Sequence, residues 1–223
     1  MTEQGSVLIL GAGPGLGLAV ARVFAEAGHA VALLGRGESR LRELAAVLQG
    51  GGHRVHVQPA DAARPQDLQA ALDAAIAELG APEVLVYNAA AARPDTPTGA
   101  AAATAEHWAD SLAVNVTGAA VAAGHVIPAF REGRGTVLLT GGGFAVAPSP
   151  DYTTLSVGKA ALRAYALALH AEQLKAGVHV STVTIRGLLR PDDARFAPAA
   201  IAPVYLELHR QPRDQWQAEY IYP

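Results

Sequence analysis

Short apolar runs alternate with longer Ala- and Leu-rich stretches along the whole chain, and this alternation limits the possible folds more than any other feature. The apolar runs predict strands at Val7–Leu10, Ala30–Leu34, Arg54–Gln58, Val84–Tyr87, Thr136–Thr140 and His179–Ile185. The stretches between them predict helices at Leu16–Ala27, Ser39–Leu48, Pro65–Leu79, Ala105–Phe130, Ser156–Ala176 and Pro198–His209. Most of the strands are almost continuously apolar, which is typical of a parallel sheet buried on both faces. The pattern therefore predicts a doubly wound α/β fold.

Composition narrows the class further. The chain has 223 residues, of which 17% are charged and 51% hydrophobic, with a formal net charge of −3 and no cysteine. This size predicts one domain, 1–223, and the absence of cysteine excludes a disulfide framework or a thiolate site. A near-neutral chain without a basic block argues against nucleic acid as the main partner. We see no signal peptide and no fully apolar stretch long enough to span a membrane, so we expect a soluble, cytoplasmic protein.

A glycine-rich loop, GAGPGLG, follows the first predicted strand and leads into a helix. Gly11, Gly13, Gly15 and Gly17 permit a tight turn and allow the backbone to approach a pyrophosphate at the positive N-terminus of the helix, which begins at Leu16. The alternative is a tight turn without a ligand. The strand–loop–helix context favours dinucleotide binding.

The second predicted strand ends at Gly35-Arg36-Gly37, about where dinucleotide-binding folds place an acidic residue against the ribose 2′-hydroxyl. An arginine can instead pair with a 2′-phosphate. Arg36 therefore favours NADP(H), with NAD(H) still possible. The alternative is a solvated arginine at a strand end.

Several motifs in chain order resemble those of the short-chain dehydrogenase/reductase family. The glycine loop matches the family's G-x-x-x-G-x-G pattern, and Asp61 matches an aspartate that contacts adenine. Asn88 and Ala89 begin a turn similar to the family's N-A-G turn, and Gly187 lies at the position of its P-G motif. The resemblance implies a Rossmann-type sheet with helices on both faces, these cofactor contacts, and assembly as a homodimer or homotetramer.

The same resemblance identifies only part of a catalytic set. Asn115 matches the asparagine of the catalytic helix, and Lys159 matches the lysine of Y-x-x-x-K, which also holds the ribose. Leu155 stands where the family has its acid tyrosine, and Gly142 stands where it has the serine that polarises the carbonyl. Both groups that handle the proton in the family are therefore replaced.

A substitute proton donor is one hypothesis. Tyr152 precedes Leu155 by three residues and Lys159 by seven, which on a continuous helix is the same face. Alternatively, Pro148 and Pro150 place Tyr152 in a loop before the helix. Backbone N–H groups of the glycines at 141–143 and protonation by solvent or substrate stay open as well.

The remaining expectations concern metals, the substrate side and assembly. The histidines are scattered and Asp192-Asp193 is an isolated pair, so we expect no metal. A short connection, Leu188–Ala197, predicts an open substrate site within a C-terminal segment, 188–223, that ends in a strand at Glu219–Tyr222. Small residues in the two long helices favour close helix packing between subunits.

Three functions fit these observations. The leading one is a divergent oxidoreductase for a small carbonyl or alcohol with NADP(H). The second is a non-catalytic NADP(H)-binding sensor on the same fold. The third is a lyase or isomerase that uses the same pocket without net redox change.

Overall fold

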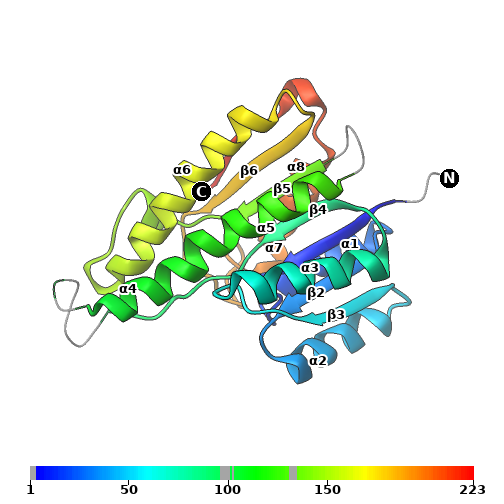
Figure 1. Ribbon diagram of the computed structural model, residues 1–223, viewed down its shortest axis with the longest axis horizontal. Coiled ribbons are helices and arrows are strands. Elements are labelled where there is room, and N and C mark those ends of the chain that lie inside the picture. The colour runs from blue at the N-terminus through cyan, green and yellow to red at the C-terminus, as the bar shows by residue number, and fades with distance from the viewer. Residues whose placement is uncertain (1–3, 96–100, 102, 131–134) are drawn as a thin grey trace.

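The computed structural model describes residues 4–95, 101, 103–130 and 135–223, so the predicted loop Ala89–Ala105 lies partly outside the described residues. In this part of the chain, seven strands form one parallel sheet in the order β3-β2-β1-β4-β5-β6-β7 (Figure 1). The strand order reverses between β1 and β4. The predicted Rossmann-type, doubly wound fold is confirmed, and the reversal marks the edge where such sheets bind ligands.

The predicted strands all form, with small differences at their ends. They are β1 (Ser6–Leu10), β2 (Val31–Gly35), β3 (Val55–Pro59), β4 (Pro82–Tyr87), β5 (Gly135–Thr140), β6 (Val178–Ile185) and β7 (Glu219–Tyr222). All residues of β1, β4, β5 and β6 are buried, as expected for inner strands covered on both faces. The predicted C-terminal strand is confirmed, since β7 pairs in parallel with β6 at the edge of the sheet.

The helices differ more from the prediction. They are α1 (Leu16–Glu26), α2 (Glu38–Gln49), α3 (Pro65–Leu79), α4 (Ala105–Leu112), α5 (Gly118–Val126), α6 (Thr153–Gln173), α7 (Pro198–Ile201) and α8 (Pro203–Arg210). The single helix predicted over Ala105–Phe130 is wrong in detail, because a π-helical segment, Ala113–Thr117, separates α4 from α5. The helix predicted over Pro198–His209 divides at Pro203, whose ring cannot continue an α-helix from the preceding turn.

Two apolar clusters hold the layers together. On one face of the sheet, Val7, Ile9 and Leu33 pack against α1, α2, α7 and α8. On the other face, Leu8 and Leu10 pack against α3, α5 and α6. Complete burial of such a side chain stabilises the fold by about 1.5–3 kcal/mol. Both layers therefore depend on the strict alternation of side chains along the inner strands.

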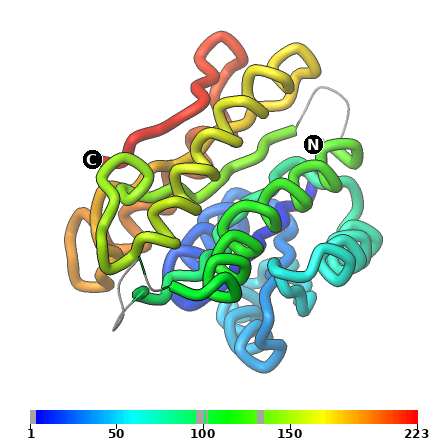
Figure 2. Tube along the Cα trace, turned by 60° about the vertical axis from the view of Figure 1, so that its left-hand side comes forward, coloured from blue at the N-terminus to red at the C-terminus, as the bar shows by residue number. Residues whose placement is uncertain are grey.

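The α4–α5 run and α6 lie side by side on the second face (Figure 1 and Figure 2). By length and composition, the helical run Ala105–Ala129 could cross a membrane, with a mean hydropathy of 1.5, and 33% of its most apolar window is buried inside the molecule. The expectation of no membrane span depended on the lack of a fully apolar stretch, and Asn115, Thr117 and His125 interrupt this run. A core helix passes the same test, so the run is weak evidence for a membrane span.

Candidate active site

The carboxyl ends of the strands open into two cavities. The smaller one, of about 450 Å³, lies over β1, β2, β3 and β4, and the larger one, of about 960 Å³, extends over β5 and β6. Gly13, Asn88 and Ala90 line both, so the two form one cleft at the reversal of strand order. This position is where open α/β sheets bind their ligands.

The glycines of the first loop have different structural roles. Gly11 has φ +89°, and a Cβ there would clash with the backbone nitrogen of Ala89. A Cβ on Gly17 would lie 2.7 Å from the Gly11 carbonyl oxygen. In contrast, a Cβ on Gly13 would meet no described atom within 4 Å. The first two glycines therefore allow the backbone to pack, whereas Gly13 leaves its side of the cleft open.

The loop presents the N-terminus of α1 to the cleft. Gly15 is the N-cap and provides no side-chain cap, so the positive end of the helix dipole is left for a ligand, and the buried Leu16 fixes the first turn. The Asn88 side chain donates its Nδ2–H to the Gly11 carbonyl oxygen at 2.9 Å. This bond joins the loop after β1 to the turn after β4.

Charged side chains stand at the far end of the smaller cavity. Arg36 is exposed at the end of β2, and Asp61 and Ala89 line the same cavity. Asp61 accepts a hydrogen bond from the Ala63 N–H at 3.0 Å, which fixes its carboxylate after β3. Burial, and then the charge of Asp61, raise the pKa of Tyr87 above its usual value. The cavity thus offers one cation and one fixed carboxylate.

Lys159 is the central polar group of the larger cavity. Its Nζ donates to the Thr140 carbonyl oxygen at 2.8 Å, and burial lowers its pKa to about 8. Leu155 lies one helical turn earlier and lines the same cavity. A Cβ on Gly142 would lie 3.9 Å from Lys159 Cε. The two residues that replace the expected tyrosine and serine therefore flank the lysine.

Asn115 lies in the π-helical segment and is completely buried. Its Oδ1 accepts from the Ala91 N–H and its Nδ2 donates to the Ala91 carbonyl, both at 3.1 Å. A Cβ on Gly158 would lie 2.8 Å from Asn115 Cβ, so the glycine allows α6 to pack closely against the π-helical segment. The Asn115 side chain holds the loop after β4 and is not among the described residues that line the cleft.

One known protein family matches most of this chain. The family model described as short chain dehydrogenase matches residues 6–190. The chain belongs to the short-chain dehydrogenase family. The cleft, the glycine loop and Lys159 all fall within the matched residues.

Relatives of this short-chain dehydrogenase include enzymes named for sugars. A probable galactose dehydrogenase of Rhizobium meliloti is 33% identical over 96% of this chain and 75% of its own. Glucose 1-dehydrogenase of Gluconobacter oxydans is 30% identical over 83% of this chain and 70% of its own. L-sorbose reductase of Gluconobacter frateurii, solved with NADPH and L-sorbose, has a TM-score of 0.88 at 25% identity, with 99% and 97% of the two chains covered.

Tyr152 occupies a different place from the family's acid tyrosine. It ends a short 3₁₀ turn, Pro150–Tyr152, just before α6. Its ring stacks on Phe144 with 5.5 Å between centroids, and Phe144 lines the larger cavity. Tyr152 itself is not among the described residues that line it. Its ring therefore contacts a residue of the cavity wall, Phe144.

The substrate side contains residues that the sequence pattern did not single out. Leu188 and Leu189 line the larger cavity and are 69% and 41% exposed, so they form an apolar mouth. Gly187 also lines it, and a Cβ there would clash with the ring of Phe196. In the sequence, the sign of this apolar mouth is the pair Leu188-Leu189 in a short connection that is otherwise mostly polar. The Thr140 carbonyl gave no signal, because backbone groups are invisible in a residue pattern.

Proposed function

We propose that the protein is an NADP(H)-dependent oxidoreductase that acts on a small carbonyl compound or alcohol and uses Lys159 as its proton-handling group. The observation that carries the proposal is the buried Lys159 ammonium inside the larger cavity, hydrogen-bonded to Thr140. The relatives support the class, since they are named as a galactose dehydrogenase, a glucose dehydrogenase and a sorbose reductase.

The described residues fit the cofactor. The uncapped N-terminus of α1 and the open side of Gly13 suit a pyrophosphate, and Arg36 suits a 2′-phosphate. Asp61 and Ala89 complete the adenosine end of the cleft, and Lys159 and Gly187 stand at the nicotinamide end. The bound nicotinamide supplies or accepts the hydride. The cofactor of the solved sorbose reductase, NADPH, supports this assignment.

The proton is the part of the reaction that this chain must handle in its own way. Leu155 has no acidic proton and Gly142 has no hydroxyl. Lys159 Nζ can donate a proton toward an oxygen in the larger cavity, and its lowered pKa makes the ammonium a better acid near neutrality. The Thr140 carbonyl orients the ammonium by accepting one of its three N–H bonds.

Tyr152 remains the second proposed donor. Its phenol would have to reach the cavity past Phe144, on which it stacks. Asn115 acts as a positioning residue in this proposal, since its side chain fixes Ala91 beside the cleft.

The larger cavity selects the substrate by its lining. Among the described residues that form it, Lys159 and Arg186 carry charge, and most others are glycine or apolar. Phe144, Leu188 and Leu189 would form the apolar part of the substrate site. The cavity therefore suits a small molecule with one carbonyl or hydroxyl group and an apolar remainder.

A cofactor-binding sensor is the second candidate function. The observation in its favour is the replacement of both expected proton-handling residues by Leu155 and Gly142, while the cofactor end of the cleft keeps its glycines and Arg36. A sensor would bind NADPH and change its association with a partner without turnover.

Assembly as a homodimer or homotetramer, in the cytoplasm, completes the proposal. The helices α5 and α6 turn some of their small residues inward, including the completely buried Ala119, Ala122 and Ala166. Ala164 and Ala168 face outward on α6, where a second copy could pack closely.

The experiment is a screen of small aldehydes, ketones and alcohols, read by the absorbance of NADPH. Wild type should turn over at least one substrate, and Lys159→Met should lower kcat by about 10²–10⁴-fold, the usual contribution of a general acid. Lys175→Met, at an exposed position just beyond the end of α6, is the matched control and should be unchanged. Loss of turnover in Tyr152→Phe, with turnover retained in Lys159→Met, would assign the role of proton donor to Tyr152. NADPH binding without any turnover would favour the sensor.

A further inference from the structure

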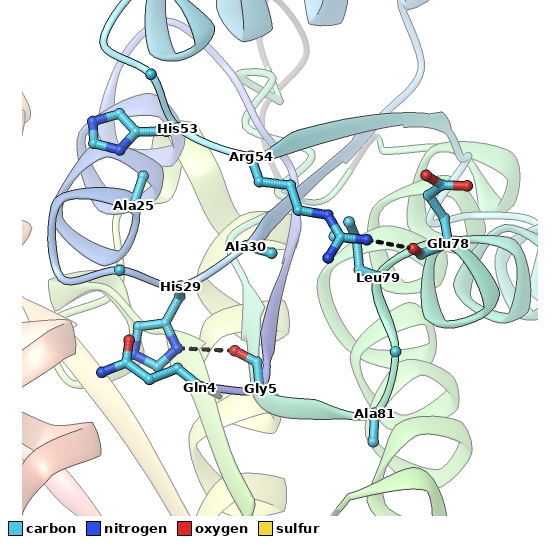
Figure 3. Close-up of a pocket in the computed structure, with 13 residues that line it drawn as sticks. Gln4, Gly5, Ala25, His29, Ala30, His53, Arg54, Glu78, Leu79 and Ala81 are labelled. Carbon is cyan, nitrogen blue, oxygen red and sulfur yellow. Dashed lines mark hydrogen bonds between the residues drawn. The ribbon is translucent and has the colours of Figure 1, made fainter. Parts of the chain in front are cut away.

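The opposite edge of the sheet contains a second cavity, away from the proposed active site. This cavity, of about 590 Å³, is lined by the segments that precede β1, β2, β3 and β4. Figure 3 shows His29 at its wall, with the ring nitrogen Nδ1 bonded to the Gly5 carbonyl. Since parallel strands all begin at this edge, residues distant in the sequence meet here.

Three potential ligands gather at this edge of the sheet, and one of them, His29, lines the cavity. His29 precedes β2, Glu83 lies in β4 and His209 lies in the last turn of α8. One ligand atom of each lies within 4.8 Å of the other two. His29 and Glu83 are buried, and His209 is half-buried. Two imidazoles and one carboxylate are a donor set that zinc takes in proteins, with the fourth position left for water.

The histidines are already oriented by bonds to oxygen. His29 Nδ1 lies 3.0 Å from the Gly5 carbonyl oxygen, which can only accept, so Nδ1 carries the proton and Nε2 holds the lone pair of the neutral ring. His209 Nδ1 lies 2.9 Å from Thr136 Oγ1. Metal-binding histidines are typically held in this way, with one nitrogen bonded to an oxygen and the other on the metal.

The carboxylate of Glu83 lacks a strong partner. In the part of the chain that the structure describes, it makes no hydrogen bond, and its one ion-pair contact is His29 Nδ1 at 4.0 Å. Its side chain is 10% exposed. Gly5 makes room for it, since a Cβ there would clash with Glu83 Cγ. A bound cation would be a closer partner for this carboxylate than His29 is.

We propose that His29, Glu83 and His209 form a binding site for a zinc-like divalent ion that fastens α8 to the amino-terminal edge of the sheet. Metal–ligand bonds of about 2.0–2.2 Å place tetrahedral ligand atoms roughly 3.3–3.6 Å apart. Ligand atoms that now lie within 4.8 Å of one another therefore have to close by up to about 1.5 Å. Imidazole ligands favour zinc over magnesium or calcium. Of the three ligands, His29 also lines the adjoining cavity.

The test is a titration of the metal-stripped protein with Zn²⁺ and, separately, with Co²⁺. We expect one ion per chain, visible absorption bands of four-coordinate Co²⁺, and a higher melting temperature with Zn²⁺ than without it. Glu83→Gln and His209→Asn should each weaken Zn²⁺ binding by about 100-fold or more and remove the Co²⁺ bands. His125→Asn removes a histidine that pairs with Asp73 at the surface and is the matched control.

Several outcomes would overturn the site. Absence of Co²⁺ bands, or Zn²⁺ binding that His209→Asn and His125→Asn weaken equally, would show that the cluster is only a packed pair of imidazole rings beside Phe24. Circular dichroism establishes that each variant is folded. Since no readout involves NADPH or turnover, failure of this site and failure of the proposed oxidoreductase are distinguishable.

Discussion

At the scale of single residues, the cleft contains Lys159, and Leu155 and Gly142 stand where the sequence resemblance implies a tyrosine and a serine. Leu155 and Gly142 flank Lys159, and a Cβ on Gly142 makes only ordinary contacts, at 3.9 Å and 4.0 Å from the lysine side chain. A small side chain at position 142 would therefore fit beside Lys159.

Introducing a serine at position 142 and a tyrosine at position 155 should raise activity. In Gly142→Ser combined with Leu155→Tyr, a phenol stands one helical turn before Lys159 and a hydroxyl faces the same space. We expect kcat/KM to rise by about tenfold or more, since a positioned general acid is worth about 10²–10⁴-fold. Steady-state kinetics with NADPH measure the change. Val157→Tyr, on an exposed face of α6, is the control; a folded double variant that binds NADPH but gains nothing would contradict the assignment.

Lysine as the proton donor predicts a specific pH dependence. The pKa of Lys159 is lowered to about 8 by burial, so the ammonium loses its proton as pH rises through that value. Carbonyl reduction needs the protonated form and should decline above about pH 8, whereas alcohol oxidation needs the neutral amine and should increase. Rate profiles in both directions measure this. Profiles that are flat between about pH 7 and pH 9 would exclude Lys159 as the group that titrates.

At the scale of elements, one aspartate fixes the start of α6. Asp95 is buried, and its carboxylate accepts bonds from the Thr154 N–H at 3.0 Å and the Thr154 hydroxyl at 2.8 Å. His107 of α4 lies 3.0 Å from the same carboxylate. The helix that carries Leu155 and Lys159 is thereby anchored to the loop after β4 and to α4.

Loss of this anchor should destabilise the protein. Asp95→Asn removes charge-assisted bonds and should lower the free energy of unfolding by about 1.5–3 kcal/mol at pH 7. Burial opposes ionisation of Asp95, but hydrogen bonds from Thr154 and His107 outweigh it and lower the pKa. The stabilisation is therefore fully present above the pKa of Asp95 in the unfolded protein, roughly 4. It is lost as the pH falls through the lower pKa that Asp95 has in the folded protein. Denaturant unfolding at pH 7 and pH 3 tests this, with the exposed Asp73→Asn as control; equal stability of wild type and Asp95→Asn at pH 7 would contradict it.

Sequence reasoning succeeded where the signal is local. Every predicted strand formed, and the runs Val7–Leu10, Ala30–Leu34 and Val84–Tyr87 are apolar throughout, as burial on both faces of a sheet requires. The glycine loop was recognisable because backbone contacts require glycine at Gly11 and Gly17. The π-helical segment at Ala113–Thr117 was not predictable, since it depends on contacts of Asn115 with a loop distant in the sequence. The grouping of His29, Glu83 and His209 likewise arises only when the sheet and α8 assemble.

At the scale of the whole molecule, the sheet separates two sites, with the cofactor cleft at its carboxyl edge and the histidine cluster at its amino edge. The outward-facing Ala164 and Ala168 of α6 mark a third surface, which we assign to contact between copies of the chain.

This assembly predicts a light-scattering mass of at least twice the chain mass. Ala164→Glu places a charge in the proposed contact and should give a monomeric mass, because a buried charge without a partner opposes association. Glu207→Ala on α8, which lies against the other face of the sheet, is the control and should leave the mass unchanged. A monomeric wild type would refute the assembly.

Binding of NADP(H) in the cleft is required by both proposed functions, and a calorimetric titration with NADPH and NADH tests this binding most directly. We expect tight binding of NADPH and weaker binding of NADH. Arg36→Ala should weaken NADPH binding by about 10–100-fold, the equivalent of one or two charge-assisted hydrogen bonds, and leave NADH unchanged. Binding of neither cofactor by the folded wild-type protein would contradict the account, because both the oxidoreductase and the sensor require an occupied cleft.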